Sequence, residues 1–346
     1  MKRLVEKDPE LKRDDLIVIT GAGGFIGGNL ALHFKKKGFQ RIRAVDKKPL
    51  YEWYLRVPGV ENLCRDVSQE DSCHRVCEGA VEVYNLAADM GGMGFIEHFR
   101  VECLRSILIN THMVEAACRA GVRRYFFSSS ACAYNTLRQQ DPNVRALRES
   151  DAYPAMAERG YGWEKLMSEM FCQEYWAERG LKTFIARFHN VYGPYGTWDG
   201  GREKAPAALC RKVIEAMDAG TKDITIWGDG HQTRSFMYID DCVEGIGLIA
   251  HCDDLIATPI NLGSSELVSI NELLTRIEKI AGVKMNRKYD LEAPKGVAGR
   301  NSDNTFIKQV LKWEPATPLD KGLAITYKWI KKQYQRRKAG KRVGVG

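Results

Sequence analysis

Residues 16–46 read LIVITGAGGFIGGNLALHFKKKGFQRIRAVD, and this stretch decides the fold. The run Leu16–Ile19 is short and apolar, which predicts a buried strand. Glycines at 21, 24 and 27 follow it and open an amphipathic helix that runs to Gly38. A second apolar run at 42–45 ends at Asp46. Strand, glycine turn, helix and strand in this order predict a βαβ unit.

The glycine turn has the context of a dinucleotide site, because it follows a strand and opens a helix. Glycine lets the backbone approach the cofactor pyrophosphate, whose negative charge the helix N-terminus favours. Asp46 lies 19 residues past Gly27 at a strand end, where a carboxylate accepts from a ribose 2′-hydroxyl and repels a 2′-phosphate. NAD is therefore expected rather than NADP. The expected cofactor-binding residues are Gly21, Gly24, Phe25, Ile26, Gly27, Asp46 and Asp66. Asp66 follows another expected strand, where it could approach the adenine. The alternative is that Asp66 is an ordinary acidic residue of a loop.

Strand-like runs recur at residues 81–86, 124–128 and 184–187, separated by stretches that can be helical. This alternation predicts an α/β fold, a Rossmann-type doubly wound parallel sheet with helices on both faces. The pattern then becomes irregular, and a strand at 259–262 and a helix at 270–281 follow. We therefore expect a smaller, interleaved α/β substrate domain. The expected division is 12–190, with returning segments near 237–265, for the NAD-binding domain, 191–236 and 266–330 for the substrate domain, and 331–346 for a basic C-terminal tail.

The composition is that of a globular protein, since 44% of the 346 residues are hydrophobic and 28% are charged. Seven of the excess positive charges lie after residue 330. A basic helix end explains the net charge of +8 as well as a nucleic-acid-binding tail does. We expect no nucleic-acid partner. The sequence has no apolar run of about 18 residues and no export signal, which predicts no membrane partner and a cytoplasmic location. Ten cysteines in that setting indicate a reducing compartment, and no cysteine and histidine set predicts a metal site.

Tyr161 and Lys165 form a Tyr-x-x-x-Lys pair in a helix-compatible stretch, so both side chains project from one face. A nearby ammonium favours the phenolate and is expected to lower the tyrosine pKa from about 10. Such a tyrosinate can take a hydroxyl proton while hydride leaves the same carbon for the nicotinamide. Ser130 closes a serine-rich strand end upstream and is expected to share this catalytic site.

Longer strings carry a resemblance to a known family. The sequence NLAA at 85–88, together with the glycine turn and the Tyr161/Lys165 pair, resembles the extended short-chain dehydrogenases that act on nucleotide sugars. A more specific set is similar to the GDP-mannose 3,5-epimerases, and the likeness covers roughly residues 16–331. These strings are DMGGMGF (89–95), SAC (130–132), RFHNVYGP (187–194), GREKAPAA (201–208), WGDGHQTRSF (227–236) and GRNSDN (299–304).

The resemblance implies conversion of GDP-α-D-mannose to GDP-β-L-galactose, with GDP-L-gulose as the product when C5 alone is inverted. Transient oxidation of C4 by bound NAD acidifies the hydrogens on C3 and C5, which an acid/base pair can then invert. Cys132 and Lys204 match that pair, because a thiol and an ammonium can tune each other to exchange protons near pH 7. Which of the two is the acid at each carbon stays open. The resemblance also implies a homodimer.

The GDP-sugar is expected to bind side chains of the irregular region. Arg234 and Arg300 suit bidentate phosphate contacts, and Lys212 adds a point charge. Lys204 has an alternative role as a phosphate contact, and Glu203 as an orienting contact. The expected substrate-binding residues are Gly91, Ser130, Ala131, Cys132, Asn190, Glu203, Lys204, Lys212, Gln232, Thr233, Arg234 and Arg300.

Two other functions remain open from the sequence. An NAD-dependent nucleotide-sugar 4-epimerase needs no acid/base pair at C3 and C5, and a 4,6-dehydratase should carry a carboxylate near Ser130, where Ala131 and Cys132 supply none. A non-catalytic, NAD-bound regulatory or nucleic-acid-binding protein would have no use for Tyr161 and Lys165.

Overall fold

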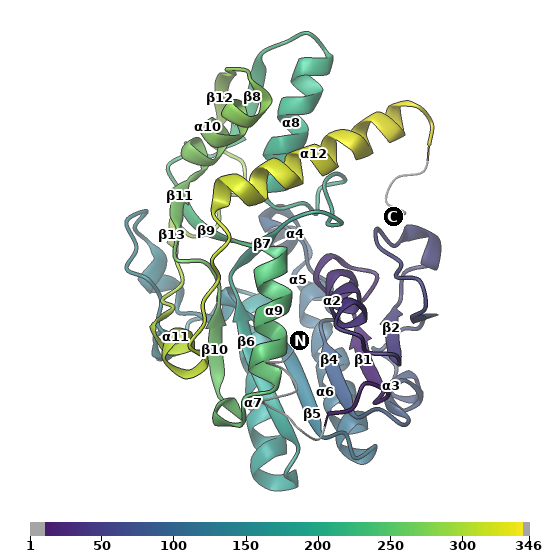
Figure 1. Ribbon diagram of the computed structural model, residues 1–346. Helices are drawn as coiled ribbons and strands as arrows, with labels where there is room; N and C mark the ends of the chain where they lie inside the picture. The colour runs from purple at the N-terminus through teal and green to yellow at the C-terminus, as the bar shows by residue number, and fades with distance from the viewer. Residues whose placement is uncertain (1–10, 342–346) are drawn as a thin grey trace.

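The computed structural model describes residues 11–341 and is built on a seven-stranded sheet (Figure 1). The strands run in the order β10-β6-β5-β4-β1-β2-β3, and every neighbouring pair is parallel. The predicted doubly wound α/β fold is confirmed. The strands are β1 (Ile17–Thr20), β2 (Ile42–Asp46), β3 (Glu61–Cys64), β4 (Glu82–Asn85), β5 (Arg124–Ser130), β6 (Lys182–Phe188) and β10 (Pro259–Leu262).

The side chains of strand β1 are buried on both faces of the sheet, because helices cover each face. All four of its residues are buried, and successive side chains point to opposite faces. Ile17 and Ile19 join the core beneath α2 and α9, whereas Val18 joins the core beneath α3, α6 and α7. These helices are α2 (Phe25–Lys36), α9 (Ile239–Ala250), α3 (Glu70–Cys77), α6 (Ser106–Arg119) and α7 (Tyr161–Arg179).

A smaller layer lies beyond the carboxyl ends of these strands, in the upper part of Figure 1. In it, β9 pairs with β7, β11 and β13, while β8 and β12 form a separate parallel pair. The chain enters this layer both before and after β10 completes the main sheet, so the two layers are interleaved. Its elements are β7 (Asn190–Tyr192), α8 (Ala205–Asp218), β8 (Asp223–Trp227), β9 (Thr233–Tyr238), β11 (Leu267–Ser269), α10 (Ile270–Ala281), β12 (Asn286–Asp290), β13 (Gly299–Arg300) and α12 (Leu319–Lys338).

Helix α10 shows how local sequence sets the element ends. Ser269 and Glu272 form a reciprocal capping box at its start, and Gly282 ends it in the left-handed conformation at φ 69°. The expected helix at 270–281 is therefore confirmed to the residue. The remaining short elements are α4 (Met93–His98), α5 (Arg100–Leu104), α11 (Thr305–Leu311) and the 3-10 turns η1 (Leu50–Glu52), η2 (Ala131–Ala133), η3 (Thr136–Gln139), η4 (Glu149–Ala152) and η5 (Asp253–Leu255).

The basic stretch after residue 330 is helical as far as Lys338. Helix α12 continues to Lys338, so the expected boundary at 331 falls inside it. Lys338 pairs with Asp218 at 2.7 Å, and the Arg337 guanidinium lies 4.6 Å from the ring centre of Trp198. These charges hold α12 to its own protein. Residues 342–346 lie outside the described part of the chain. Within residues 11–341, no helix is long and apolar enough to cross a membrane.

Candidate active site

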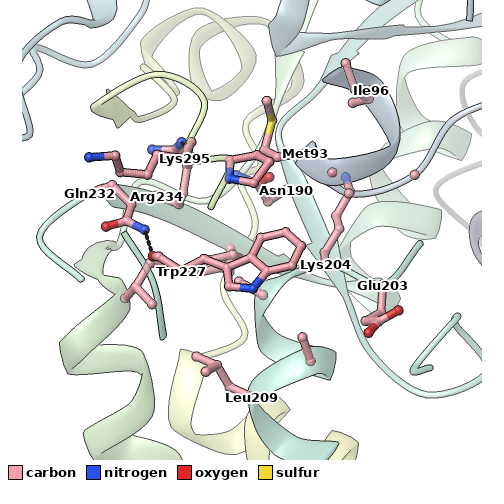
Figure 2. Close-up of a pocket in the computed structure, with 18 of the residues that line it drawn as sticks. Met93, Ile96, Asn190, Glu203, Lys204, Leu209, Trp227, Gln232, Arg234 and Lys295 are labelled. Carbon is pink, nitrogen blue, oxygen red and sulfur yellow. Dashed lines mark hydrogen bonds between the residues drawn. The ribbon is translucent and has the colours of Figure 1, made fainter. Parts of the chain in front are cut away.

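A cavity of about 460 Å³ opens between the two layers, at the carboxyl ends of β5 and β6. Crevices at the carboxyl ends of parallel strands are the usual binding places of such folds. Most of the expected substrate and catalytic residues line it, which confirms that the fold brings them together (Figure 2). They are Gly91, Ser130, Ala131, Cys132, Tyr161, Asn190, Glu203, Lys204, Lys212, Gln232, Arg234 and Arg300.

The glycine turn after β1 packs so closely against neighbouring backbone that side chains would not fit. Gly21 has φ 72°, and a β-carbon there would lie 2.6 Å from the carbonyl oxygen of Leu86. A β-carbon on Gly27 would overlap the carbonyl oxygen of Gly21. No side chain caps α2, which starts at Phe25 with Ile26 in its first turn. The exposed N-terminus of this helix therefore fits a pyrophosphate.

Two carboxylates stand at neighbouring strand ends beside this turn. Asp46 ends β2, and its Oδ1 accepts from the amide of Lys48 at 2.9 Å. Asp66 follows β3, the strand paired with β2, and accepts from the amide of Ser68 at 2.9 Å. Lys47 is drawn away to Asp89, at 2.6 Å. The acidic edge suits ribose hydroxyls better than an added phosphate.

The Tyr161/Lys165 pair lies on the first turns of α7, as predicted. The Lys165 Nζ is 5.5 Å from the ring centre of Tyr161 and 4.8 Å from that of Phe127. It is buried without a hydrogen-bond partner, and its nearest carboxylate oxygen, on Glu164, is 3.7 Å away. A buried ammonium without acceptors is costly, so this atom fits the ribose hydroxyls of a dinucleotide.

The expected low pKa of Tyr161 is wrong for the protein without ligands. Burial raises the pKa of the Tyr161 phenol well above its ordinary value, and the Cys132 and Glu164 charges raise it further. A hydrogen bond with Ser130 acts in the opposite direction but does not outweigh the burial. The charge of Lys165 alone would lower the pKa of Tyr161, but the loss of water around the phenolate dominates.

Cys132 lies in the η2 turn that follows β5. The Ser130 Oγ accepts from the Cys132 amide at 3.2 Å and sets the turn. Its thiol is nearly buried, and burial raises the pKa of that thiol. Phe95, Ile96, Cys103 and Tyr161 form one apolar cluster with Cys132, which shields the thiol from water.

Lys204 reaches the same cavity from the smaller layer. It is the N-cap residue of α8, and its side chain is half-buried. Among the described residues its Nζ makes no hydrogen bond, and burial lowers the pKa of the ammonium while the nearby Cys132 raises it. A thiol with a raised pKa and an amine with a lowered pKa are thus brought toward each other in protonation energy.

The two arginines differ from the expectation that both are free for a diphosphate. Arg234 Nη atoms donate to the carbonyl oxygens of Thr233, Lys295 and Val297 at 2.7, 3.1 and 2.7 Å, and burial lowers the pKa of Arg234 to about 10. Arg300 instead lies at the thiol, where its Nη1 donates to the Cys132 Sγ at 3.4 Å. Both line the cavity, but neither extends as a free side chain.

Three other expected substrate contacts have partners within the protein. Thr233 does not line the cavity, because its hydroxyl donates to the carbonyl oxygen of Pro142. Glu203 pairs with Arg211 at 2.8 Å. Lys212 Nζ donates to the carbonyl oxygen of Thr225 at 2.7 Å. Thr233 is therefore a structural residue in this conformation.

Three residues of chemical interest, in the cavity wall or next to it, were not predicted from the sequence. Trp227 lines the cavity with 44% of its surface exposed, and its indole lies between Gln232 and Lys204 in Figure 2. His189 also lines it, with Nδ1 buried and without a partner. Glu158 places a carboxylate behind Cys132, bonded to Arg300. An aromatic residue inside a glycine-rich motif was the available signal for Trp227. No sequence pattern marked Glu158.

The chain is similar in sequence to proteins of a known family. A sequence profile of the NAD dependent epimerase/dehydratase family matches residues 17–263. The chain belongs to this family. It is 44% identical over 329 residues to GDP-mannose 3,5-epimerase 1 of Oryza sativa subsp. japonica, covering 93% of this chain and 83% of that relative. It is also 44% identical over 324 residues to GDP-mannose 3,5-epimerase of Arabidopsis thaliana, covering 93% of this chain and 84% of that relative.

A solved structure of the family agrees with the fold and the cofactor. UDP-glucuronic acid 4-epimerase from Bacillus cereus, in complex with UDP-glucuronic acid and NAD, superposes with a TM-score of 0.77 at 25% identity and covers 91% of this chain and 99% of that chain. The resemblance to GDP-mannose 3,5-epimerases and the NAD dependence inferred from the motifs are both confirmed.

Proposed function

We propose that this protein inverts C3 and C5 of GDP-mannose, giving GDP-L-galactose, and gives GDP-L-gulose when C5 alone is inverted. The observation that carries the proposal is that Cys132, Lys204 and Tyr161 line one cavity although they come from three different segments. A simple 4-epimerase needs the tyrosine but not the thiol and amine. The 44% identity to plant GDP-mannose 3,5-epimerases supports the same substrate.

The reaction begins at the hydroxyl on C4 of the mannose ring. The glycine turn, Asp46, Asp66 and Lys165 would hold NAD, which would accept the C4 hydride and later return it. Tyr161 takes the C4 hydroxyl proton, with the ammonium of Lys165 stabilising the phenolate. Ser130, which bonds the phenol, orients that oxygen. The product of this step is a 4-keto sugar whose C3 and C5 hydrogens are acidic.

Inversion then uses the thiol and the amine. One of Cys132 and Lys204 removes the proton from C5 or C3, and the other returns a proton to the opposite face of the ring. Burial disfavours the charged form of both groups, so each can act in turn as a proton donor and a proton acceptor. Tyr161 finally returns its proton to the C4 oxygen as the ketone is reduced.

The rest of the cavity suits the nucleotide. The exposed face of Trp227 can stack on a planar base, as aromatic rings commonly do. Asn190, Gln232 and Lys212 lie along the wall and offer polar contacts, and the Oε1 of Gln232 is buried without a partner. Binding of the diphosphate by Arg234 requires its guanidinium to exchange a carbonyl partner for phosphate oxygens.

We also propose that two copies of the chain associate through α5 and α7. One face of α7 exposes Trp163, Met167 and Met170 at 44, 50 and 47%. Val101 and Leu104 add to this apolar surface at 66 and 45% exposure. Large apolar side chains spaced three and four residues apart form a stripe on a helix, and an exposed stripe of this size marks an interface. Self-association of this face accounts for it without another partner.

Product analysis tests the function directly. The protein, with the NAD that it retains, is incubated with GDP-mannose in deuterated water, and the sugars are identified by chromatography and NMR. GDP-L-galactose and GDP-L-gulose with deuterium at C3 or C5 are expected. A product changed at C4 only, without solvent deuterium at C5, would instead identify a 4-epimerase. The cytoplasmic location stays a prediction.

A further inference from the structure

A buried ion pair stands directly behind the thiol of the candidate acid/base pair. The Arg300 Nη2 donates to Glu158 Oε1, and the Nη1 of the same guanidinium donates to the Cys132 Sγ at 3.4 Å. The Nε donates to Gln139 at 2.7 Å. The side chains of Arg300 and Glu158 are only 7 and 11% exposed. Glu158 is not among the residues that line the cavity, but its carboxylate also accepts a hydrogen bond from the Cys132 thiol, so it acts on the thiol both directly and through Arg300.

The backbone fixes Glu158 at this place. Its amide donates to the carbonyl oxygen of Cys132 at 3.0 Å, and its own carbonyl oxygen accepts from the amide of Trp163 at 3.3 Å. Glu158 is therefore tied on one side to the turn that carries the thiol and on the other to the first turn of α7. A residue held in this way can set the position of Arg300 relative to Cys132.

The charges near Cys132 need a negative partner. Arg300 on β13 is the register neighbour of Arg234 on β9, so two guanidinium groups lie side by side in a largely dry region. An uncompensated buried charge is costly, and the Glu158 carboxylate is close enough to both to lower that cost. The other polar or titratable groups that face Cys132 are Ser130, Tyr161, Cys103 and Lys204.

We propose that Glu158 is a positioning residue for inversion: its carboxylate holds Arg300 against Cys132 and offsets the guanidinium charge at the thiol. The proposal rests on the proposed function, because it matters only if Cys132 exchanges protons with substrate. Glu158 does not touch substrate. It keeps the thiol from being converted wholly to thiolate by Arg300, so that Cys132 can both give and accept a proton.

The electrostatic directions agree with this role. Burial raises the pKa of the Cys132 thiol, Glu158 raises it further, and Arg300 lowers it. Burial alone would raise the pKa of Glu158, but the charge and hydrogen bond of Arg300, the hydrogen bond of Cys132 and the charge of Arg234 together lower it, so Glu158 is a carboxylate at neutral pH. The two partners thus act on the thiol with opposite signs.

The test is the pH dependence of Cys132 alkylation in Glu158→Gln, Arg300→Gln and the double variant. Iodoacetamide modification of the Cys132 peptide is followed by mass spectrometry, and the NAD-loaded protein is used without substrate. In Glu158→Gln the midpoint of the alkylation profile should fall by about one pH unit, a tenfold gain in thiolate below the midpoint. In Arg300→Gln it should rise, and the double variant should lie between them.

The opposite shifts expected in the two single variants distinguish the proposed role of Glu158 from a general loosening of the site. A variant that merely opened the site to water would lower the midpoint in both single variants, because burial raises the thiol pKa, and that result would overturn the proposal. So would an unchanged midpoint in Glu158→Gln. Glu169→Gln is the matched control, since Glu169 also pairs with a buried arginine, Arg187, at 2.6 Å, but lies on α7 and not in the loop that carries Glu158. It should lose stability without moving the midpoint.

A conservative variant covers a failure to fold. If Glu158→Gln does not fold, Glu158→Asp keeps the charge and should keep the midpoint within a few tenths of a pH unit, and a fall by a full unit there counts against the proposal. The pH profile of epimerisation is then compared with that of alkylation. If alkylation shifts in Glu158→Gln while the epimerisation profile does not, Glu158 controls the thiol as proposed, and it is the assignment of Cys132 to the reaction that fails.

Discussion

Gly162 lies directly against the carbonyl oxygen of Cys132, so closely that a β-carbon on Gly162 would overlap that oxygen. This contact presses the first turn of α7 onto the η2 turn and brings Tyr161 into the same apolar cluster as Cys132. Tyr161 and Cys132 can therefore lie this close together because Gly162 has no side chain. The glycine follows Tyr161 directly in the sequence.

We expect Gly162→Ala to impair catalysis more than stability. The methyl group must push α7 from η2, which moves Tyr161 away from Ser130, and misplacement by about 1 Å can cost roughly 100-fold in rate. Steady-state kinetics with GDP-mannose measure the loss. Gly180→Ala is the control at the other end of the same helix, since a β-carbon there meets nothing within 4 Å. It should cost about 1 kcal/mol of stability because Gly180 has φ 71°, with kcat little changed.

Cys132→Ala and Lys204→Ala should stop inversion while leaving C4 oxidation possible. Removal of a positioned acid or base lowers the rate by about 10²–10⁴-fold. A bound keto sugar with reduced nicotinamide should then accumulate, visible by absorbance in a single-turnover experiment. Tyr161→Phe should show neither absorbance change nor deuterium uptake at C5, because the ketone forms first. Cys172→Ala, a buried cysteine in the other core, is the control. Near-normal epimerisation by Cys132→Ala would reduce this cysteine to packing.

Asp46→Ala should weaken retention of NAD. The carboxylate at the end of β2 is placed for the ribose hydroxyls, and loss of a charged hydrogen-bond acceptor costs roughly 1.5–3 kcal/mol, or about 10- to 100-fold in affinity. The NAD content of the purified protein and its dissociation during dialysis measure this. Asp71→Ala, an exposed acid at the start of α3, should retain as much cofactor as the unchanged protein. Equal retention in both variants would remove Asp46 from the site.

His189 should make the protein less stable as the solution is acidified. Burial lowers its pKa from 6.5 to about 3, with Nε2 bonded to Asn261. Below pH 6.5 the unfolded chain binds a proton at this histidine, whereas the folded protein does not bind it until about pH 3. The free energy of unfolding therefore decreases as the pH is lowered from about 6.5 to about 3. Between pH 7 and 5 this histidine accounts for roughly 2 kcal/mol. Urea unfolding of His189→Asn should show a correspondingly smaller fall, whereas His98→Gln, an exposed histidine, should behave like the unchanged protein.

Met167→Glu should dissociate the proposed dimer. A carboxylate in the middle of the apolar stripe on α7 would have to be buried without a partner in the interface. Sedimentation velocity measures the mass directly, with Glu174→Lys on the same helix as the surface-charge control. A monomeric unchanged protein would refute the dimer, and an unaffected dimer in Met167→Glu would place the interface elsewhere.

The sheet, the glycine turn and twelve of the residues that line the cavity could be predicted from the sequence. Alternating apolar runs fix strands and helices because their periods of 2 and 3.6 residues are local properties. The capping box of α10 and its glycine stop set that helix to the residue. Tyr161 and Lys165, one turn apart, share a helix face in any fold that keeps the helix.

Only the tertiary structure decided what surrounds those residues. Arg300 approaches Cys132 from 168 positions away, and Glu158 completes the group from a loop with no recognisable motif. Burial raised the pKa of Tyr161 where its charged neighbour alone suggested a decrease. Desolvation depends on every segment that packs around a group, and such long-range packing leaves no mark in the spacing of residues along the chain.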